Sequence, residues 1–443
     1  MFINNARVGD RIRLDYSAEQ IGETADFLKR QGTFTFSPLP NGLFPAASLG
    51  ESKSYTGYSY VWVRDNIHIA YAHYSVGHVS TATKTLGTLM QYFIKHRSRF
   101  IDIIARRTSP DDVMKRPHIR FNGSTLEEVN ERWAHAQNDA LGYFLWLYSK
   151  LVNEKKLSPA ADELDTLLLF PLYFEAIRFW EDEDSGHWEE TRKVSASSIG
   201  TVIAGLREFG RLVSNVPVVC KSNQKVITLE FIESLQRYGL GALESMLPAE
   251  CVQADASKQR LYDSALLFLI YPLQVVETRV AEIILGNVIG HLQGEFGIRR
   301  YPGDSYWAPD YKKRMKPSER TMDFSDDIVR RDQFLPSLGQ EAQWCIFDPI
   351  VSCIYGTKFK EKRTEEVLSK QTEYLNRSLG QITSEGLPDI PAFRCPELYY
   401  LEDGRYVPND HVPLLWTQAN LMLSLSVMQE SCMLGRPLRA LGS

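Results

Sequence analysis

The chain has 443 residues and a formal net charge of −5, from 50 Lys and Arg against 55 Asp and Glu. This mildly negative balance gives nucleic-acid binding no electrostatic support, and we expect no nucleic-acid partner. The N-terminal stretch has no apolar core of signal-peptide length, and no later segment runs about 18 residues without polar breaks, so we expect a cytoplasmic protein without a membrane span.

The aromatic content is high, at 11% within a hydrophobic fraction of 44%. This composition supports a large core, and aromatic side chains also suit sugar binding, although they fill cores more often. The six cysteines lie far apart without a CxxC pair, and the nine histidines show no HExxH spacing. We therefore expect reduced thiols, no metal site and no cofactor.

Helical periodicity recurs along the chain, whereas strand-type alternation is scarce. Helix-length patterns cover residues 18–29, 82–93, 131–151, 167–179, 230–247, 257–270, 273–290, 340–355 and 361–379, and further helices begin near Trp62, Ala196 and Trp416. Long loops rich in aromatic residues, Gly and Pro recur between them, notably at 294–311 and 386–413. The pattern predicts an all-α chain. It favours a closed ring of helical hairpins over a solenoid, because no fixed sequence period emerges.

An acidic run at residues 181–184 leads into the triplet Trp188, Glu189 and Glu190. A carboxyl group against an apolar wall has a raised pKa and can keep its proton near neutral pH, as the general acid of a glycosidase must. On this stretch alone, the commoner interpretation is a solvated acidic loop in which Glu189 caps the following helix.

Two other stretches carry polar or aromatic groups with two interpretations. Arg64 and Asp65 offer a donor fork and an acceptor to one pair of sugar hydroxyls, or they form a simple salt bridge. In the loop at 294–311, Tyr306 and Trp307 stack on sugar rings or pack in the core.

Taken together and in this order, the segments resemble the glucoamylase family, glycoside hydrolase family 15, and its relative the α subunit of phosphorylase kinase. The resemblance covers almost the whole chain. It implies a six-hairpin (α/α)6 toroid, with residues 1–443 as a single glucoamylase-like catalytic domain and the active site in its funnel. The run Pro-Glu-Leu-Tyr-Tyr, which begins at Pro396, is closer to the kinase subunit.

The resemblance also implies roles for particular residues. Glu189 matches the family's general acid and Glu397 its general base. The residues that match its substrate-binding segments are Tyr58, Trp62, Arg64, Asp65, Trp133, Trp188, Glu190, Arg300, Tyr301 and Asp304. The family's Arg-Tyr-Pro-Glu-Asp loop has Gly303 here in place of its glutamate, which leaves the preference beyond the first sugar open.

These matches predict an inverting glycoside hydrolase that releases glucose from α-glucans or maltooligosaccharides. Inversion requires the carboxyl groups of Glu189 and Glu397 to lie roughly 6.5–9.5 Å apart. We expect Trp188 and Trp133 to help keep Glu189 protonated, and polar neighbours such as Tyr399 or Arg300 to help keep Glu397 ionised.

Other interpretations remain open. Glu190 is a second candidate for the acid, or it pairs with Arg64 or Arg300 to clamp the substrate. The protein is alternatively a non-catalytic glycan-binding or regulatory protein, as the likeness to the kinase subunit implies. A third possibility is a hydrolase of the same fold that acts on another α-glucoside such as trehalose, because loops set the far side of the scissile bond.

Overall fold

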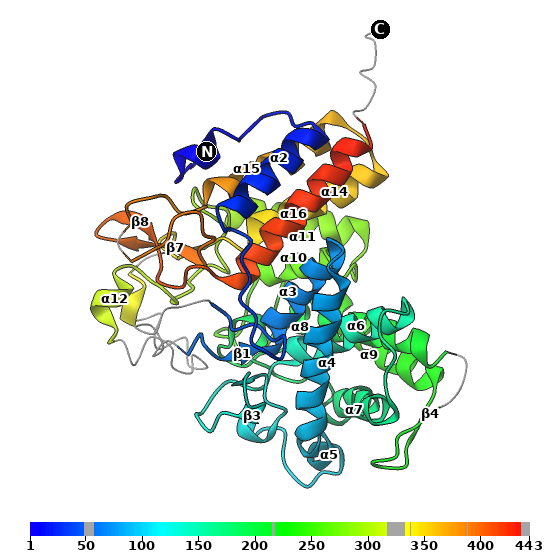
Figure 1. Ribbon diagram of the computed structural model, residues 1–443. Coiled ribbons are helices and arrows are strands. Elements are labelled where there is room, and N and C mark those ends of the chain that lie inside the picture. The colour runs from blue at the N-terminus through cyan, green and yellow to red at the C-terminus, as the bar shows by residue number, and fades with distance from the viewer. Residues whose placement is uncertain (48–56, 215–217, 317–332, 337, 388, 436–443) are drawn as a thin grey trace.

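Helices dominate the computed structural model, which describes residues 1–47, 57–214, 218–316, 333–336, 338–387 and 389–435 (Figure 1). Six of the described helices follow one another around the centre: α3 Val63–Ser75, α6 Asn138–Asn153, α8 Ala196–Leu212, α10 Leu267–Ile270, α14 Phe347–Glu361 and α16 Leu415–Met433. Each contacts the next, and α16 returns to α3, so the six helices form a closed ring.

A second layer of helices packs outside this ring. It consists of α2 Ala18–Arg30, α4 Val79–Lys95, α7 Ala161–Ile177, α9 Leu229–Met246, α11 Thr278–His291 and α15 Glu365–Gly380. Five of them contact the inner helix that they directly follow. The sixth, α2, comes from the N-terminal part of the chain and packs on α16 from the C-terminal part, so the last hairpin joins the two ends (Figure 1).

Burial separates the two layers. Nearly every residue of α6 and α8 is buried, because other elements surround these helices. In the outer helix α2, only Ile21, Thr24, Phe27 and Leu28 are buried, which is the one-sided apolar stripe of a surface helix. The sequence pattern thus already distinguishes helices with apolar residues all round from those with a single apolar face.

Short strands and helices fill the connections. Among the described residues, β1 Val61–Trp62, β2 Arg120–Asn122 and β3 Glu127–Glu128 form one antiparallel sheet, and β4 Val218–Val219 pairs with β5 Val226–Ile227. A third sheet contains β6 Gln343–Trp344, β7 Leu398–Glu402 and β8 Arg405–Pro408. Short helices are α1 Ala6–Gly9, α5 Ser98–Ile104 and α12 Tyr311–Arg314. In the third sheet Trp344 lies opposite Leu398, which fixes the place of Glu397 immediately before β7.

The structure has the predicted ring of helical hairpins, while the bounds of some predicted helices are wrong. Residues 257–270 were expected to form one helix, but only the turn Ser264–Leu266 and α10 are helical there. The cause is the backbone pairing of Arg260 with Cys251, which holds the segment extended. The helix expected from residue 340 begins at Phe347, because Gln343 and Trp344 form β6. The assignment of the whole chain to one domain stays a prediction.

No helix within the described residues combines the length and the apolar character that crossing a membrane requires.

The contact between α6 and α8 depends on glycine. A Cβ atom added at Gly142 would lie 2.8 Å from backbone atoms of Thr201 and Val202, whereas one added at Gly241 in α9 would meet nothing within 4 Å. We expect Gly142→Ala to destabilise the protein by about 1–3 kcal/mol because the helices must move apart. Gly241→Ala should stabilise it by about 0.5–1 kcal/mol, because alanine favours the helix. Urea unfolding of both variants tests this; equal effects would contradict the close approach.

Candidate active site

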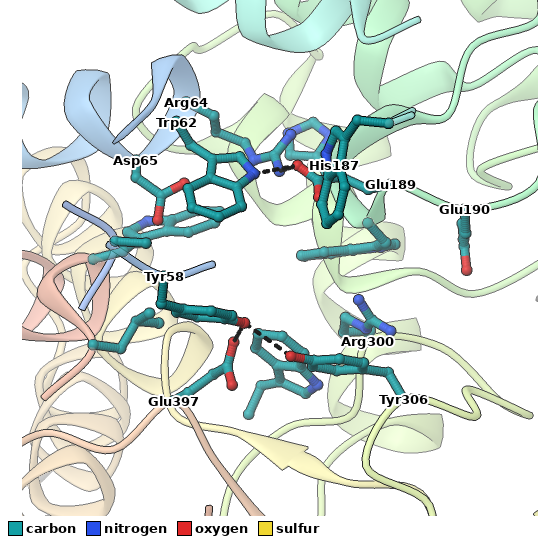
Figure 2. Close-up of a pocket in the computed structure, with 16 residues that line it drawn as sticks. Tyr58, Trp62, Arg64, Asp65, His187, Glu189, Glu190, Arg300, Tyr306 and Glu397 are labelled. Atoms are coloured by element: carbon teal, nitrogen blue, oxygen red, sulfur yellow. Dashed lines mark hydrogen bonds and ion pairs between the residues drawn. The ribbon is translucent and has the colours of Figure 1, made fainter. Parts of the chain in front are cut away.

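A pocket lies where the inner helices begin. Its walls come from the first residues of α3 and α16 and from the loops that precede the other inner helices. The lining residues are Ala46, Tyr58, Trp62, Arg64, Asp65, Trp133, His187, Trp188, Glu189, Glu190, Arg300, Tyr306, Trp344, Glu397, Leu414 and Trp416. Every predicted site residue is among them except Tyr301 and Asp304, which lie behind the wall. Figure 2 shows Glu189 on one side of the pocket and Glu397 on the opposite side.

Glu189 occupies a strained backbone conformation. It follows the short 3₁₀ turn Gly186–Trp188 and has φ 58° and ψ 44°, in the left-handed region that residues other than glycine rarely adopt. Such a conformation persists only where the surroundings impose it. Here Asp184 and Lys193 exchange two backbone hydrogen bonds of 2.9 Å, which tie the two ends of the loop together.

The acidic run before Glu189 is not a solvated loop. Both oxygens of Asp182 accept 2.7 Å hydrogen bonds from the buried Arg116 guanidinium. Asp184 is 1% exposed and accepts a 3.0 Å hydrogen bond from the backbone N–H of Asn138, at the start of α6. The helix that follows is capped at Ser195 and not by Glu189. Asp182 and Asp184 therefore anchor the loop that presents Glu189, whereas Glu181 is exposed.

The carboxyl group of Glu189 is held by donors from β1 and from the start of α3. Oε1 accepts a 2.8 Å hydrogen bond from Trp62 Nε1 and lies 3.3 Å from Arg64 Nη2. Burial raises the pKa of Glu189, and the positive charge of Arg64 opposes that rise without cancelling it. The environment thus favours a protonated carboxyl group more than solvent does. Trp62 supplies the indole contact that the sequence analysis expected from Trp188 and Trp133.

Arg64 and Asp65 have different surroundings. Arg64 Nη1 donates 2.9 Å hydrogen bonds to Gln137 and to the buried carboxylate of Asp139, so its ion pairs are with Asp139 and Glu189. Asp65 faces the pocket, where burial raises its pKa to about 7 against the pull of Arg64. The salt bridge between neighbours, which was one interpretation of this pair, is not what the structure has.

Trp133 and Gln137 lie in the extended segment before α6 and not within a helix, as the sequence pattern suggested. Trp133 packs edge-on against Trp62, with ring centroids 6.1 Å apart, and the guanidinium of Arg120 lies 3.9 Å from its ring centroid. Trp133 and Arg120 thus pack behind Trp62, the residue that donates a hydrogen bond to Glu189. Arg120 comes from β2, whose register places it opposite Trp62.

Glu190 is held by two cations and a phenol. It pairs with Lys193 at 3.1 Å and with Arg260, and it accepts a hydrogen bond from Tyr301. Burial alone would raise its pKa, but Arg260 and Lys193 outweigh burial and hold the pKa well below its usual range. A carboxylate this firmly ionised is a poor proton donor, which disfavours Glu190 as the acid.

The partners of Glu190 differ from the expected Arg64 and Arg300. Arg300 instead makes a bidentate ion pair with the fully buried Asp304, with contacts of 2.6 and 2.5 Å. Its guanidinium also lies 4.8 Å from the ring centroid of Trp344 and 5.3 Å from that of Trp188. These contacts fix Arg300 in the wall of the pocket.

The departure at Gly303 has a structural basis. Gly303 has φ 86°, which glycine adopts readily and glutamate does not, and its N–H donates a 2.8 Å hydrogen bond to Glu341. A carboxylate from a different segment therefore supports this loop.

The carboxylate of Glu397 accepts three hydrogen bonds. Tyr58 donates to Oε1 at 2.6 Å, while Asn409 Nδ2 and His411 Nδ1 lie 2.5 and 2.7 Å from Oε2. The expected neighbours are wrong: the hydroxyl of Tyr399 donates to the backbone of Gln381 instead, and Arg300 pairs with Asp304. Glu397 is thus surrounded by hydrogen-bond donors, whereas burial raises the pKa of Glu189.

Sequence reasoning missed several residues at the site. Asn409 and His411 lie only 12 and 14 positions after Glu397, but no sequence pattern marks them. His187 lines the pocket floor, and burial lowers its pKa to about 4, so that its imidazole is neutral. Trp307 packs in the core, whereas Tyr306 lines the pocket, and its stacking on a sugar ring stays a prediction. The described residues contain no cluster of three or more side chains suited to a metal ion.

Residues 33–230 match the model of glycosyl hydrolases family 15. An uncharacterized lipoprotein of Escherichia coli (strain K12), YgeQ, is 28% identical over 205 residues, which are 42% of this chain and 78% of that protein. The skeletal muscle isoform of the phosphorylase b kinase regulatory subunit alpha of Oryctolagus cuniculus is 26% identical over 330 residues, or 69% of this chain and 24% of the subunit. The chain thus spans about a quarter of that subunit's length.

Solved structures confirm the fold class. A glycosidase variant in complex with glucose matches with a TM-score of 0.61 at 15% identity, over 98% of this chain and 100% of that chain. The glucoamylase of Saccharomycopsis fibuligera gives 0.59 at 12%, over 94% and 97%. A bacterial glucoamylase complexed with acarbose gives 0.54 at 15%, over 90% and 54%. The model is therefore an (α/α)6 fold like that of glucoamylases.

Sequence and fold agree: residues 33–230 are similar to glycosyl hydrolases family 15, the chain is distantly similar to phosphorylase kinase α subunits, and its fold is that of glucoamylases.

Proposed function

We propose that the protein is an inverting glycoside hydrolase that releases glucose from the ends of α-glucans or maltooligosaccharides. The observation that carries the proposal is the pair of unlike carboxyl groups across one pocket (Figure 2). Burial raises the pKa of Glu189, while three hydrogen-bond donors surround Glu397. Two carboxyl groups in contrasting environments are what glycoside hydrolysis requires.

In the proposed reaction each group has one task. Glu189 donates its proton to the glycosidic oxygen as the bond breaks. Glu397 accepts a proton from the water that attacks the anomeric carbon from the opposite face, which inverts the configuration. Arg64 and Trp62 hold the acid in place and stabilise the carboxylate that remains after proton transfer.

The lining of the pocket suits a sugar. The aromatic rings of Trp133, Trp344 and Trp416 line it, and such rings suit the apolar faces of a sugar. Asp65 offers an acceptor in the same pocket. Two of the matched structures contain glucose and acarbose, which supports a glucan-type ligand here. The cytoplasmic location stays a prediction.

The strongest rival is a glycan-binding or regulatory role without turnover, because several relatives are regulatory subunits of phosphorylase kinase. Hydrolysis of another α-glucoside such as trehalose is the second. Both alternative functions use the same pocket. In the first the ligand is bound without hydrolysis, and in the second the substrate is a different α-glucoside.

Substitution of either carboxyl group tests the proposal. We expect Glu189→Gln and Glu397→Gln each to lower kcat on maltooligosaccharides by about 10²–10⁴-fold, because each removes one proton transfer and keeps the shape of the side chain. NMR of the first product should show β-glucose from an α-linked substrate, with trehalose and starch assayed in parallel.

The outcomes separate the three roles. Release of α-glucose would contradict inversion, and preferred turnover of trehalose would select the second rival. A native protein that binds maltooligosaccharides and turns over none of the three substrates would favour the regulatory role.

Asp65 links function to stability. Its pKa is about 7 in the folded protein, mainly because it is buried, and about 3.9 when unfolded. The folded state therefore holds the proton more tightly, and the contribution of this group to stability falls as the pH rises from about 4 to 7.

We expect Asp65→Asn to lower activity but to raise the free energy of unfolding, by more at pH 8 than at pH 5. The gain at pH 8 should be on the order of 2–4 kcal/mol, since one pKa unit corresponds to about 1.4 kcal/mol. Urea unfolding at both pH values measures it. A stability difference that does not change between pH 5 and pH 8 would contradict the raised pKa.

A further inference from the structure

The two oxygens of the Glu397 carboxylate are not equivalent. Oε2 accepts hydrogen bonds from Asn409 Nδ2 at 2.5 Å and from His411 Nδ1 at 2.7 Å. Among the described residues Oε1 accepts one, from the hydroxyl of Tyr58 at 2.6 Å. A carboxylate oxygen has two lone pairs. Both lone pairs of Oε2 are therefore occupied, while Oε1 keeps one.

The protonation of His411 follows from its partner. An ionised carboxylate can only accept hydrogen bonds, so a nitrogen 2.7 Å from it must carry a hydrogen. His411 Nδ1 also lies 3.3 Å from Asn409 Nδ2, a longer contact that the charged acceptor outcompetes. The imidazole is thus in the form that carries hydrogen on Nδ1.

His411 is rigidly placed. It is 2% exposed, and its ring stacks on that of Tyr58, with centroids 3.6 Å apart and an interplanar angle of 22°. Trp307 meets it edge-on at 5.7 Å. Tyr58 thus contacts Glu397 through its hydroxyl and His411 through its ring, so that one side chain fixes both the base and its partner.

We propose that Oε1 of Glu397 is the oxygen that takes the proton of the attacking water, and that His411 and Asn409 are positioning residues that hold Oε2. This inference rests on the proposed hydrolase function. The water oxygen bonds to the anomeric carbon while its proton passes to Oε1. The electron pair of the breaking glycosidic bond stays on the leaving oxygen, which takes the proton of Glu189.

If His411 positions Oε2, its substitution should change kcat and leave KM nearly unchanged. The orientation of Oε1 matters when water attacks and not when the sugar binds, so the effect belongs to kcat rather than KM. A carboxylate without its clamp on Oε2 can rotate, and a small misplacement of a reacting group costs up to about 100-fold in rate.

Two substitutions separate the hydrogen bond from the ring. His411→Phe keeps an aromatic ring against Tyr58 and removes the donor, and we expect it to lower kcat by about 10–100-fold with KM changed less than about 3-fold. His411→Asn can place an amide N–H close to the position of Nδ1, and it should recover most of the lost rate. His291→Phe, at an exposed position of α11, is the matched control.

Thermal unfolding of each variant checks that it is folded. Full kcat in His411→Phe would overturn the inference, and so would an Asn variant as slow as the Phe variant. Absence of turnover in the native protein would instead overturn the proposed function.

A second measurement does not depend on turnover. In the full chain labelled with ¹⁵N-histidine, the signals of His411 are identified by their loss in His411→Asn. We expect nitrogen shifts of the form with hydrogen on Nδ1, and these shifts should change in Glu397→Gln. Shifts of the form with hydrogen on Nε2 alone would overturn the inference.

Discussion

The contact between α16 and α3 closes the ring, and the candidate site depends on it. Glu189 precedes α8 and Glu397 lies between α15 and α16, about 200 positions later in the chain. A linear stack of hairpins would keep these segments apart, whereas a closed ring brings the starts of all inner helices to one end. Tyr58 and Glu397 illustrate the result, because their 2.6 Å hydrogen bond joins the segment before α3 to the loop before α16. The outer contact between α2 and α16 stabilises the same closure, since it buries the first long helix on the last.

Within the ring, the two carboxyl groups differ because their neighbours differ. Glu189 faces an indole and a guanidinium that is already paired with Asp139, so burial outweighs the attraction of Arg64 and the pKa rises. Glu397 is surrounded by three hydrogen-bond donors, from Tyr58, Asn409 and His411. Adjacent positions in the sequence do not give the two glutamates the same pKa shift. Glu190 pairs with Arg260 and Lys193, and these cations lower its pKa. Adjacent glutamates thus have opposite proton affinities because the side chains point to different partners.

The sequence predicted most of the helices and most of the residues around the pocket, because amphipathic periodicity and the Trp-Glu-Glu and Trp-x-Arg-Asp segments are local signals. It failed where a long-range contact overrides a local preference. The segment at 257–270 has helical periodicity, yet the pairing of Arg260 with Cys251 holds it extended. The acidic run before Glu189 has the composition of a solvated loop, yet Arg116, more than sixty positions earlier, buries Asp182. No local pattern marks Asn409 or His411, since their role depends on an acceptor, Glu397, that lies on the other side of the β7–β8 hairpin.

The energetic cost of the site favours a chemical role over simple binding. Glu189 sits in a left-handed backbone conformation, which costs on the order of 1–2 kcal/mol for such a residue, and Asp65 is buried with a pKa of about 7. Two exposed, ionised carboxylates would be enough for a pocket that only bound a sugar, and they would lower the stability of the fold very little. What binding does not require is the difference between the two groups: burial raises the pKa of Glu189, while three hydrogen-bond donors surround Glu397 across the same cavity. Proton transfer in both directions requires that difference, and the loop anchored by Asp184 and Asp182 maintains it against the strain.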